Sequence, residues 1–147
     1  MSYHLNIRVA DGAEIAQLAQ LDPIALRDEK RKAFIGKAVE MGHCWIATDA
    51  HDQRSLLGYG ILNHSFFEQN FIALVVVKEN ARRQGVATAI IKALEAQCCG
   101  NRVFTSTNAS NMSMRGLLDR LGYTGSGQID NLDAGDPELV FVKLITS

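Results

Sequence analysis

The chain has 147 residues, of which 47% are hydrophobic and 21% are charged, and its formal net charge at pH 7 is -1. A chain of this length suits one domain with a single core, so we expect residues 1–147 to form a single domain. The near-zero net charge gives no global electrostatic reason to expect nucleic acid or an anionic membrane as a partner, so any anion site must be local.

The sequence shows no transport or membrane segment. The first residues, MSYHLNIRVADGAE, lack a basic stretch followed by an apolar run, and no window approaches the roughly 18 apolar residues of a membrane span. Of the three cysteines, Cys98 and Cys99 are neighbours, with Cα atoms about 3.8 Å apart, too close for an ordinary disulfide. A reducing, cytoplasmic setting is therefore expected.

The first third of the chain predicts one strand and two helices. LNIRV at 5–9 has the character of a strand, and Asp11 followed by Glu14 has the form of a capping box that opens a helix, which ends at LDP. A second helix is predicted from about 24 to 41, with Gly42 as its stop. Its apolar side would consist of Leu26, Ala33, Phe34, Ala38 and Met41.

Three antiparallel strands are predicted next. They are HCWIATD at 43–49, LLGYGILNHSFF at 56–67 and NFIALVVV at 70–77, separated by the polar turn AHDQRS and the short link EQ. Residues 72–77 have no polar residue at alternating positions, which predicts a central strand covered on both faces.

The remaining residues return to an alternation of helices and strands. Helical periodicity returns from Val86 to Gln97, and RVFTST at 102–107 follows as a strand, so this crossover predicts that 72–77 and 102–107 are parallel neighbours. NMSMRGLLDRLG at 111–122 predicts another helix. PELVFVKLI at 137–145 predicts a last strand that pairs with YTGSGQI at 123–129.

The stretch LVVVKENARRQGVATAII, residues 74–91, joins a strand to a helix start, where the first amide groups lack an intrahelical partner and attract anions. The amides of 84–88 would point into the turn, and Gly85 would let a ligand approach the backbone closely. Arg82 and Arg83 add positive charge, which suits a diphosphate. The same residues also fit a solvated basic turn with a glycine that eases the bend.

The usual nucleotide-binding loops are absent. The Walker pattern G-x-x-x-x-G-K-[ST] is not matched, because only Gly85 is present. The dinucleotide pattern G-x-G-x-x-G is also missing, since GYTGSGQID follows a helix and lacks the last glycine. ATP and NAD are therefore poor candidates.

RRQGVA at 82–87 resembles the [QR]-x-x-G-x-[GA] loop of the GNAT superfamily of acyl-CoA-dependent N-acyltransferases, with Arg82, Gly85 and Ala87 at the defining positions. NASNMSMRGLLDRLGY at 108–123 resembles the second cofactor segment of that family, and the order of elements is similar over nearly the whole chain. The resemblance implies an α/β (α+β) fold: a mixed, mostly antiparallel central sheet of about six to seven strands, flanked by about four helices, with a parallel pair at the CoA cleft.

The resemblance also implies acetyl-CoA as co-substrate and no metal. The pantetheine arm would pair with the strand before the loop as an added strand, and the loop would hold the pyrophosphate. Asn108 and Asn111 would lie at the rim of the cleft, although helix capping is an equal alternative for both. The implied cofactor-binding residues are Val75, Val76, Val77, Arg82, Arg83, Gln84, Gly85, Val86, Ala87, Thr88, Asn108 and Asn111.

The implied reaction moves an acetyl group to a primary amine of a small molecule or peptide, by direct attack in a ternary complex. A base, often acting through water, must take a proton from the amine, and a backbone N–H, such as that of Val75, would stabilise the charged oxygen. The sequence departs from the family in two places: Ala73 stands where many members have a glutamate, and Leu118 where many have a proton-donating tyrosine.

Substitutes for these two side chains can be named. Glu68 and His64, near the start of the same strand and the end of the preceding one, are candidate bases, and histidine suits proton transfer near neutral pH. Tyr123 and Ser113 are candidate acids. The alternatives are a surface position for His64 and a core position for Tyr123.

The acceptor and the partners stay open. The acidic segment DNLDAGDPE, 130–138, would attract a cationic amine, or it is a solvated turn. A non-catalytic acyl-CoA-binding or sensor module and a plain interaction domain are the rival interpretations. A homodimer paired through the sheet end or the first helices is also open.

Overall fold

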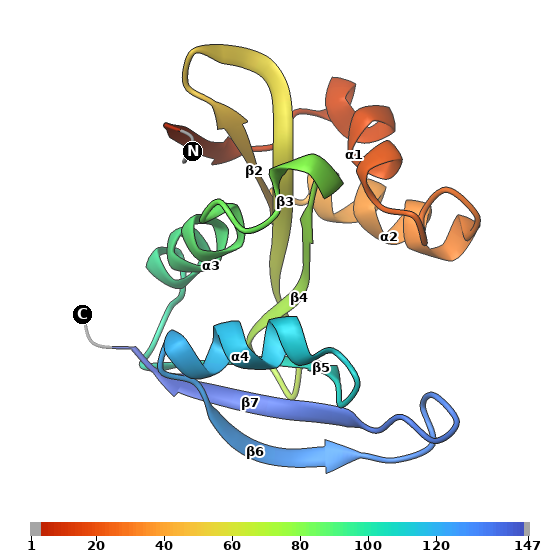
Figure 1. Ribbon diagram of the computed structural model, residues 1–147, viewed down its shortest axis with the longest axis vertical. Helices are drawn as coiled ribbons and strands as arrows, with labels where there is room; N and C mark the ends of the chain where they lie inside the picture. The colour runs from red at the N-terminus through yellow and green to blue at the C-terminus, as the bar shows by residue number, and fades with distance from the viewer. Residues whose placement is uncertain (1–3, 146–147) are drawn as a thin grey trace. The chain divides into compact units, whose positions relative to one another are not determined.

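The computed structural model describes residues 4–145 (Figure 1). The described residues form one seven-stranded sheet with the order β1-β2-β3-β4-β5-β7-β6, four α-helices and two short 3-10 helices, η1 (Gly12–Glu14) and η2 (Glu79–Ala81). The strands are β1 (Leu5–Val9), β2 (Cys44–Asp49), β3 (Asp52–Phe66), β4 (Gln69–Val77), β5 (Arg102–Asn108), β6 (Thr124–Ile129) and β7 (Glu138–Leu144). The helices are α1 (Ile15–Leu21), α2 (Glu29–Glu40), α3 (Val86–Ala96) and α4 (Met112–Arg120).

The pairing confirms the predicted mixed sheet. β4 and β5 are parallel, with the register Phe71↔Phe104 and Ile72↔Thr105, whereas β1–β2, β2–β3, β5–β7 and β6–β7 are antiparallel. The chain divides into two compact units. The first contains the described residues up to 62 together with 74–96, and the second contains 63–73 together with the described residues from 97 onward.

In the first unit, α3 packs closely against β3 because two glycines leave room for it. A Cβ at Gly60 would lie 2.6 Å from Cγ2 of Ile90, and a Cβ at Gly58 would lie 3.1 Å from Cδ1 of the same residue. The buried side chains of α3 are Val86, Ile90, Ile91 and Leu94. The two glycines of the segment GYG in β3 therefore allow α3, the helix that follows the basic loop, to pack close to the strand.

The capping box is confirmed, although it opens a 3-10 turn before the α-helix. Asp11 accepts a hydrogen bond from the amide of Ala13, and the Glu14 carboxylate accepts one from the amide of Asp11 at 2.8 Å. Glu14 also receives two bonds from the Arg8 guanidinium, at 3.0 and 2.7 Å. The pKa of the Glu14 carboxyl is lowered, and the hydrogen bond from Arg8 is the largest cause.

The prediction for the second helix was wrong in its start and in its buried side. Asp28 caps α2 by accepting a bond from the amide of Lys30, so the helix begins at Glu29 and the residues before it form turns. The buried residues of α2 are Ile35, Ala38 and Val39, whereas Phe34 is 39% exposed. The predicted side was one position away from the side that packs, and only Ala38 belongs to both.

The polar turn before β3 is also shorter than predicted. β3 begins at Asp52, which pairs with Asp49, so Ala50 and His51 alone connect the strands. In the second unit the link between β3 and β4 consists of Phe67 and Glu68, whose φ angles are 51° and 62°. Two successive positive φ values match the twist that a tight hairpin turn requires.

Candidate functional site

The basic loop leaves β4, passes through η2 and enters α3 within the first unit (Figure 1). The amide of Lys78 donates to the carbonyl of Leu57 at 2.8 Å, and Ala81 is completely buried, so both hold the first half of the loop. Arg83 has a φ of 63° and Gly85 a φ of 82°, and these two left-handed residues turn the chain into the helix.

The loop presents a row of free amides. Within residues 4–145, none of the amide groups of residues 83–88 donates a hydrogen bond, and the first bond of the helix runs from Ala89 to the carbonyl of Gly85. Successive amides at a helix start concentrate positive partial charge and point toward one place. Six such groups offer the kind of donors that an anion with several oxygen atoms, such as a diphosphate, requires.

Space and charge at the loop suit the same kind of ligand. A Cβ built on Gly85 has no atom within 4 Å, so the surface above it is open, and the φ of 82° there strongly favours glycine. Arg82 and Arg83 are exposed, and no carboxylate among the described residues pairs with either. Val86 is 1% exposed, so it contributes its amide and packs its side chain in the core.

The strand before the loop differs from the prediction in its burial. Ile72 is 3% exposed, but residues 73–77 are half-buried, so the expectation of a strand covered on both faces was wrong for this part. Val75, Val76 and Val77 therefore remain partly exposed although they are apolar. Because the hydrophobic effect favours burying such surface, these side chains suit contact with an apolar ligand arm.

Asn108 and Asn111 lie in the second unit, and each has a structural partner. Asn111 caps α4, since its side chain accepts a bond from the amide of Met114 at 3.1 Å. Asn108 donates from Nδ2 to the Asp133 carboxylate at 2.8 Å and to the carbonyl of Asp136. The capping alternative is therefore confirmed for Asn111, whereas Asn108 holds the acidic segment.

The acidic segment before β7 is fastened to the β5–α4 connection. The Asp136 carboxylate accepts from the amide of Ser110 at 3.0 Å and from its hydroxyl at 2.6 Å, and the amide of Ala109 donates to the carbonyl of Pro137. Asp136 is thus engaged in holding the turn. This bonding, together with the exposure of residues 130–135, supports the interpretation of the segment as a solvated turn.

His64 belongs to a hydrogen-bonded group in the second unit that the sequence did not reveal. Its Nε2 lies 3.0 Å from Oδ1 of Asn70, which is 5% exposed, and Nδ2 of Asn70 donates to the carbonyls of Cys99 and Arg102 at 2.6 and 2.8 Å. The missed signal was a lone asparagine at the start of an apolar strand. Because both amide hydrogens of Asn70 are used on carbonyls, Oδ1 must accept, and Nε2 of His64 must carry the hydrogen.

The other two catalytic candidates lie in the same unit but in different surroundings. Glu68 is exposed, in the turn between β3 and β4. Tyr123 is 3% exposed, and Nζ of Lys143 lies 5.6 Å from the centre of its ring. Tyr123 therefore occupies the core position that was its alternative, and of the three candidates His64 and Glu68 are the ones with exposed side chains.

The chain is similar to known proteins in sequence and in structure. A family model described as the acetyltransferase (GNAT) family matches residues 13–123. A GNAT-family acetyltransferase from Bacillus cereus is 26% identical, with a TM-score of 0.87 over 97% of this chain and 99% of that one. None of the curated protein sequences matches the chain.

Two further structures share the fold at lower identity. yncA from Salmonella typhimurium, solved with its cofactor acetyl-CoA, is 14% identical, with a TM-score of 0.74 over 97% of this chain and 94% of that one. NAA60 from Arabidopsis thaliana, solved with a bisubstrate analogue, is 20% identical, with a TM-score of 0.76 over 96% and 98%.

The family model matches well over half of the chain and includes residues of both units, so the chain belongs to the GNAT family of acetyltransferases. The activity class of this family is acetyl-CoA-dependent acetylation. Among residues 4–145, no group of three or more histidine, cysteine, aspartate or glutamate side chains could hold a metal ion. No helix in the same part of the chain is long and apolar enough to cross a membrane.

Proposed function

We propose that this chain is a cytoplasmic N-acetyltransferase that moves an acetyl group from acetyl-CoA to a primary amine of a small molecule or peptide. The amine would attack the thioester directly in a ternary complex. The observation that carries the proposal is the row of free amides at residues 83–88. Beside it lie the open surface above Gly85 and two arginines, Arg82 and Arg83, that form no ion pair within residues 4–145. This arrangement has the chemistry that the diphosphate of acetyl-CoA needs. All three cysteines are free, which fits a reducing compartment.

Acetyl transfer requires that the attacking amine lose a proton, because a protonated amine has no lone pair. We assign His64 as the first candidate for this step and Glu68 as the second. In the neutral imidazole of His64, Nε2 carries the hydrogen that Asn70 accepts, which leaves the lone pair on Nδ1 free. Asn70 thereby fixes both the tautomer and one ring position. Tyr123, which is 3% exposed, is the third candidate, with protonation of the leaving thiolate as its role.

The test of the base uses two matched variants. If His64 accepts the proton, His64→Gln keeps a donor toward Asn70 but removes the base, so kcat falls by about 100-fold or more while KM for acetyl-CoA stays unchanged. Glu68→Gln serves as the parallel variant. Unchanged kcat in His64→Gln together with a large loss in Glu68→Gln would transfer the role to Glu68.

A non-catalytic acyl-CoA-binding module is the second candidate. It is favoured by Ala73 and Leu118, which stand where many family members have their catalytic glutamate and tyrosine. Leu118 is 1% exposed and is the buried residue of α4, so this position itself supplies no proton donor. Such a module would bind acetyl-CoA as the enzyme does and would release no thiol.

Thiol release from acetyl-CoA separates the two candidates. We expect release with at least one amine in a panel of polyamines, amino acids, aminoglycosides and peptides. In parallel, acetyl-CoA at 100 times its dissociation constant should add about 2.7 kcal/mol to the free energy of unfolding. Stabilisation without thiol release would support the module. If acetyl-CoA does not stabilise the protein, both candidates are wrong, because each of them binds acetyl-CoA.

Two substitutions at Gly85 locate the site. Gly85→Ala and Gly85→Glu impose the same strain at a φ of 82°, but only the second places a carboxylate over the free amides. We expect Gly85→Glu to abolish acetyl-CoA binding and Gly85→Ala to weaken it less. Equal affinity in the glutamate variant and the native protein would place the diphosphate elsewhere.

A further inference from the structure

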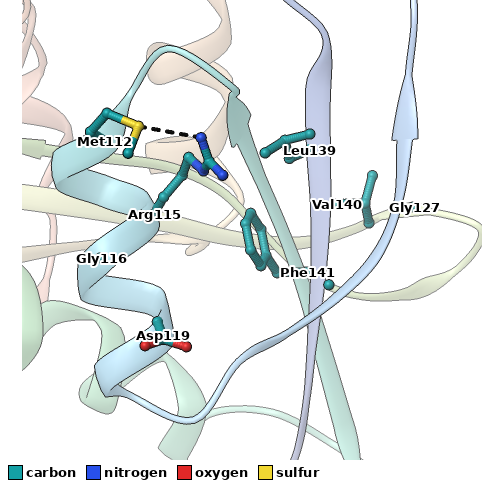
Figure 2. Close-up of a pocket in the computed structure, with 9 residues that line it drawn as sticks. Met112, Arg115, Gly116, Asp119, Gly127, Leu139, Val140 and Phe141 are labelled. Atoms are coloured by element: carbon teal, nitrogen blue, oxygen red, sulfur yellow. Dashed lines mark hydrogen bonds between the residues drawn. The ribbon is translucent and has the colours of Figure 1, made fainter.

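A cavity of about 470 Å³ lies in the second unit between α4, β6 and β7 (Figure 2). The helix contributes Met112, Arg115 and Asp119, and the floor is the β7 segment from Leu139 to Phe141. The volume falls in the range of small-molecule sites. None of the residues assigned to acetyl-CoA or to proton transfer lines it.

The cavity stays open because its wall on β6 has almost no side chains. Gly125 and Gly127 line it, and a Cβ built on Gly125 would meet no atom within 4 Å. Gly127 has a φ of 131° and lies at an irregularity in the pairing of β6 with β7. On the helix side Gly116 also lacks a side chain. A larger residue at Gly125 would fill the space above β7.

Arg115 is the cation of this cavity, and its position is fixed. Its Nη1 donates to the carbonyl of Ala109 at 2.8 Å and lies 3.3 Å from Sδ of Met112, as Figure 2 shows for the latter. Among residues 4–145, no carboxylate lies within 4 Å of this half-buried guanidinium. The donors Nη2 and Nε therefore remain available for an anion, and a guanidinium binds a carboxylate through two parallel bonds.

The rest of the lining narrows the class of ligand. Leu139, Val140 and Phe141 give the floor apolar surface, which favours a hydrocarbon body. Asp119, one helical turn beyond Arg115, is exposed and disfavours a ligand with a second negative charge. We propose that this cavity binds a small organic monocarboxylate with a compact apolar body, whose carboxylate pairs with Arg115 and whose hydrocarbon part covers β7.

The probes are hexanoate and phenylacetate, with hexanamide and phenylacetamide as neutral analogues of the same shape. Titrations of the ¹⁵N-labelled protein should give saturable shifts for the amides of residues 112–119 and 139–141. We expect hexanamide and phenylacetamide to bind at least about tenfold more weakly than the two acids, because the neutral ligands cannot form the charged pair with Arg115. Failure of both acids to saturate any of these signals by about 10 mM would overturn the proposal.

Two variants test the assigned contacts. Arg115→Gln should weaken the acids at least about tenfold and leave the neutral analogues unchanged. Gly125→Val should block acids and amides alike, because it fills the cavity at a position with free space and no positive φ. Their melting temperatures show whether both variants are folded. Acid affinity equal to that of the native protein in a folded Arg115→Gln or Gly125→Val variant would refute the site.

Discussion

Gly58 lies so close to the backbone of Val76 that a Cβ at Gly58 would be 2.6 Å from the Val76 carbonyl oxygen. The contact joins β3 to the part of β4 from which the basic loop begins. A backbone atom gives way far less easily than the end of a side chain. The spacing of β3, β4 and α3 therefore depends on glycine at this position.

Gly58→Ala should accordingly destabilise the protein by about 1–3 kcal/mol, because the added methyl group forces the strand or α3 to move. Urea unfolding measures this loss. Gly12→Ala is the control, since a Cβ there meets nothing within 4 Å and the φ is not positive. Equal stability of the two variants would show that β3 and β4 adjust without cost.

Glu14 should make stability depend on acid. Its pKa is lowered in the folded state, mainly by the hydrogen bond from Arg8, so its contribution is present above the pKa of the unfolded chain and is lost as the pH falls through the folded value. The difference in unfolding free energy between the native protein and Glu14→Gln should be about 1 kcal/mol or less at pH 7, because Arg8 is about a third exposed. It should shrink below about pH 4.

Denaturant unfolding at several pH values measures that difference. Glu40→Gln is the matched control, since it removes an exposed carboxylate that forms no ion pair within residues 4–145. A difference for Glu14→Gln that stays constant between pH 7 and about pH 3 would mean that the Arg8 bond does not select the ionised carboxylate.

Asn70→Asp should cost at least about 2 kcal/mol, because a carboxylate cannot donate to the carbonyls of Cys99 and Arg102 and would face both with negative charge. Asn101→Asp is the control: the Asn101 side chain accepts from Nε of Arg102, and an aspartate can do the same. We expect its effect to stay within about 0.5 kcal/mol. Equal melting temperatures of Asn70→Asp and Asn101→Asp would show that the bonds of Asn70 do not stabilise the fold.

Cysteine alkylation should separate Cys44 from Cys99. Burial raises the pKa of the Cys44 thiol to about 12, so at pH 8 only about one molecule in 10⁴ carries the reactive thiolate there. Cys99 is exposed. Mass spectrometry after brief iodoacetamide treatment should find Cys99 modified and Cys44 intact, and urea should remove the protection. Early modification of Cys44 in the folded protein would contradict its burial.

Short-range sequence patterns predicted much of the fold. The capping box at Asp11 and Glu14 and the turn at Gly42, whose φ is 75°, depend on neighbours a few residues away and were predicted from the sequence. The buried side of α2 was not, because a helical period fits two adjacent faces equally well when both hold apolar residues. Packing against the rest of the first unit selects Ile35 and Val39 and leaves Phe34 partly exposed.

In the candidate site too, the local features were predicted from the sequence and the long-range contacts were not. The motif around Gly85 predicted a loop with free amides, because a glycine before a helix has a local geometric meaning. The partners of Asn108 and Asn70 could not be predicted, since these bonds join residues 25 to 32 positions apart and depend on how the strands pair. The polar side chains of a site are therefore harder to assign from sequence than its backbone.

In the proposed enzyme, the amides of residues 83–88 hold the diphosphate of acetyl-CoA. The direct measurement is an NMR titration of the ¹⁵N-labelled protein with acetyl-CoA and, separately, with S-acetylpantetheine, which has the same thioester arm without the diphosphate. We predict large shifts of the amides of residues 83–88 with acetyl-CoA and none of comparable size with S-acetylpantetheine. Saturation by acetyl-CoA with these six amides unmoved would contradict the account.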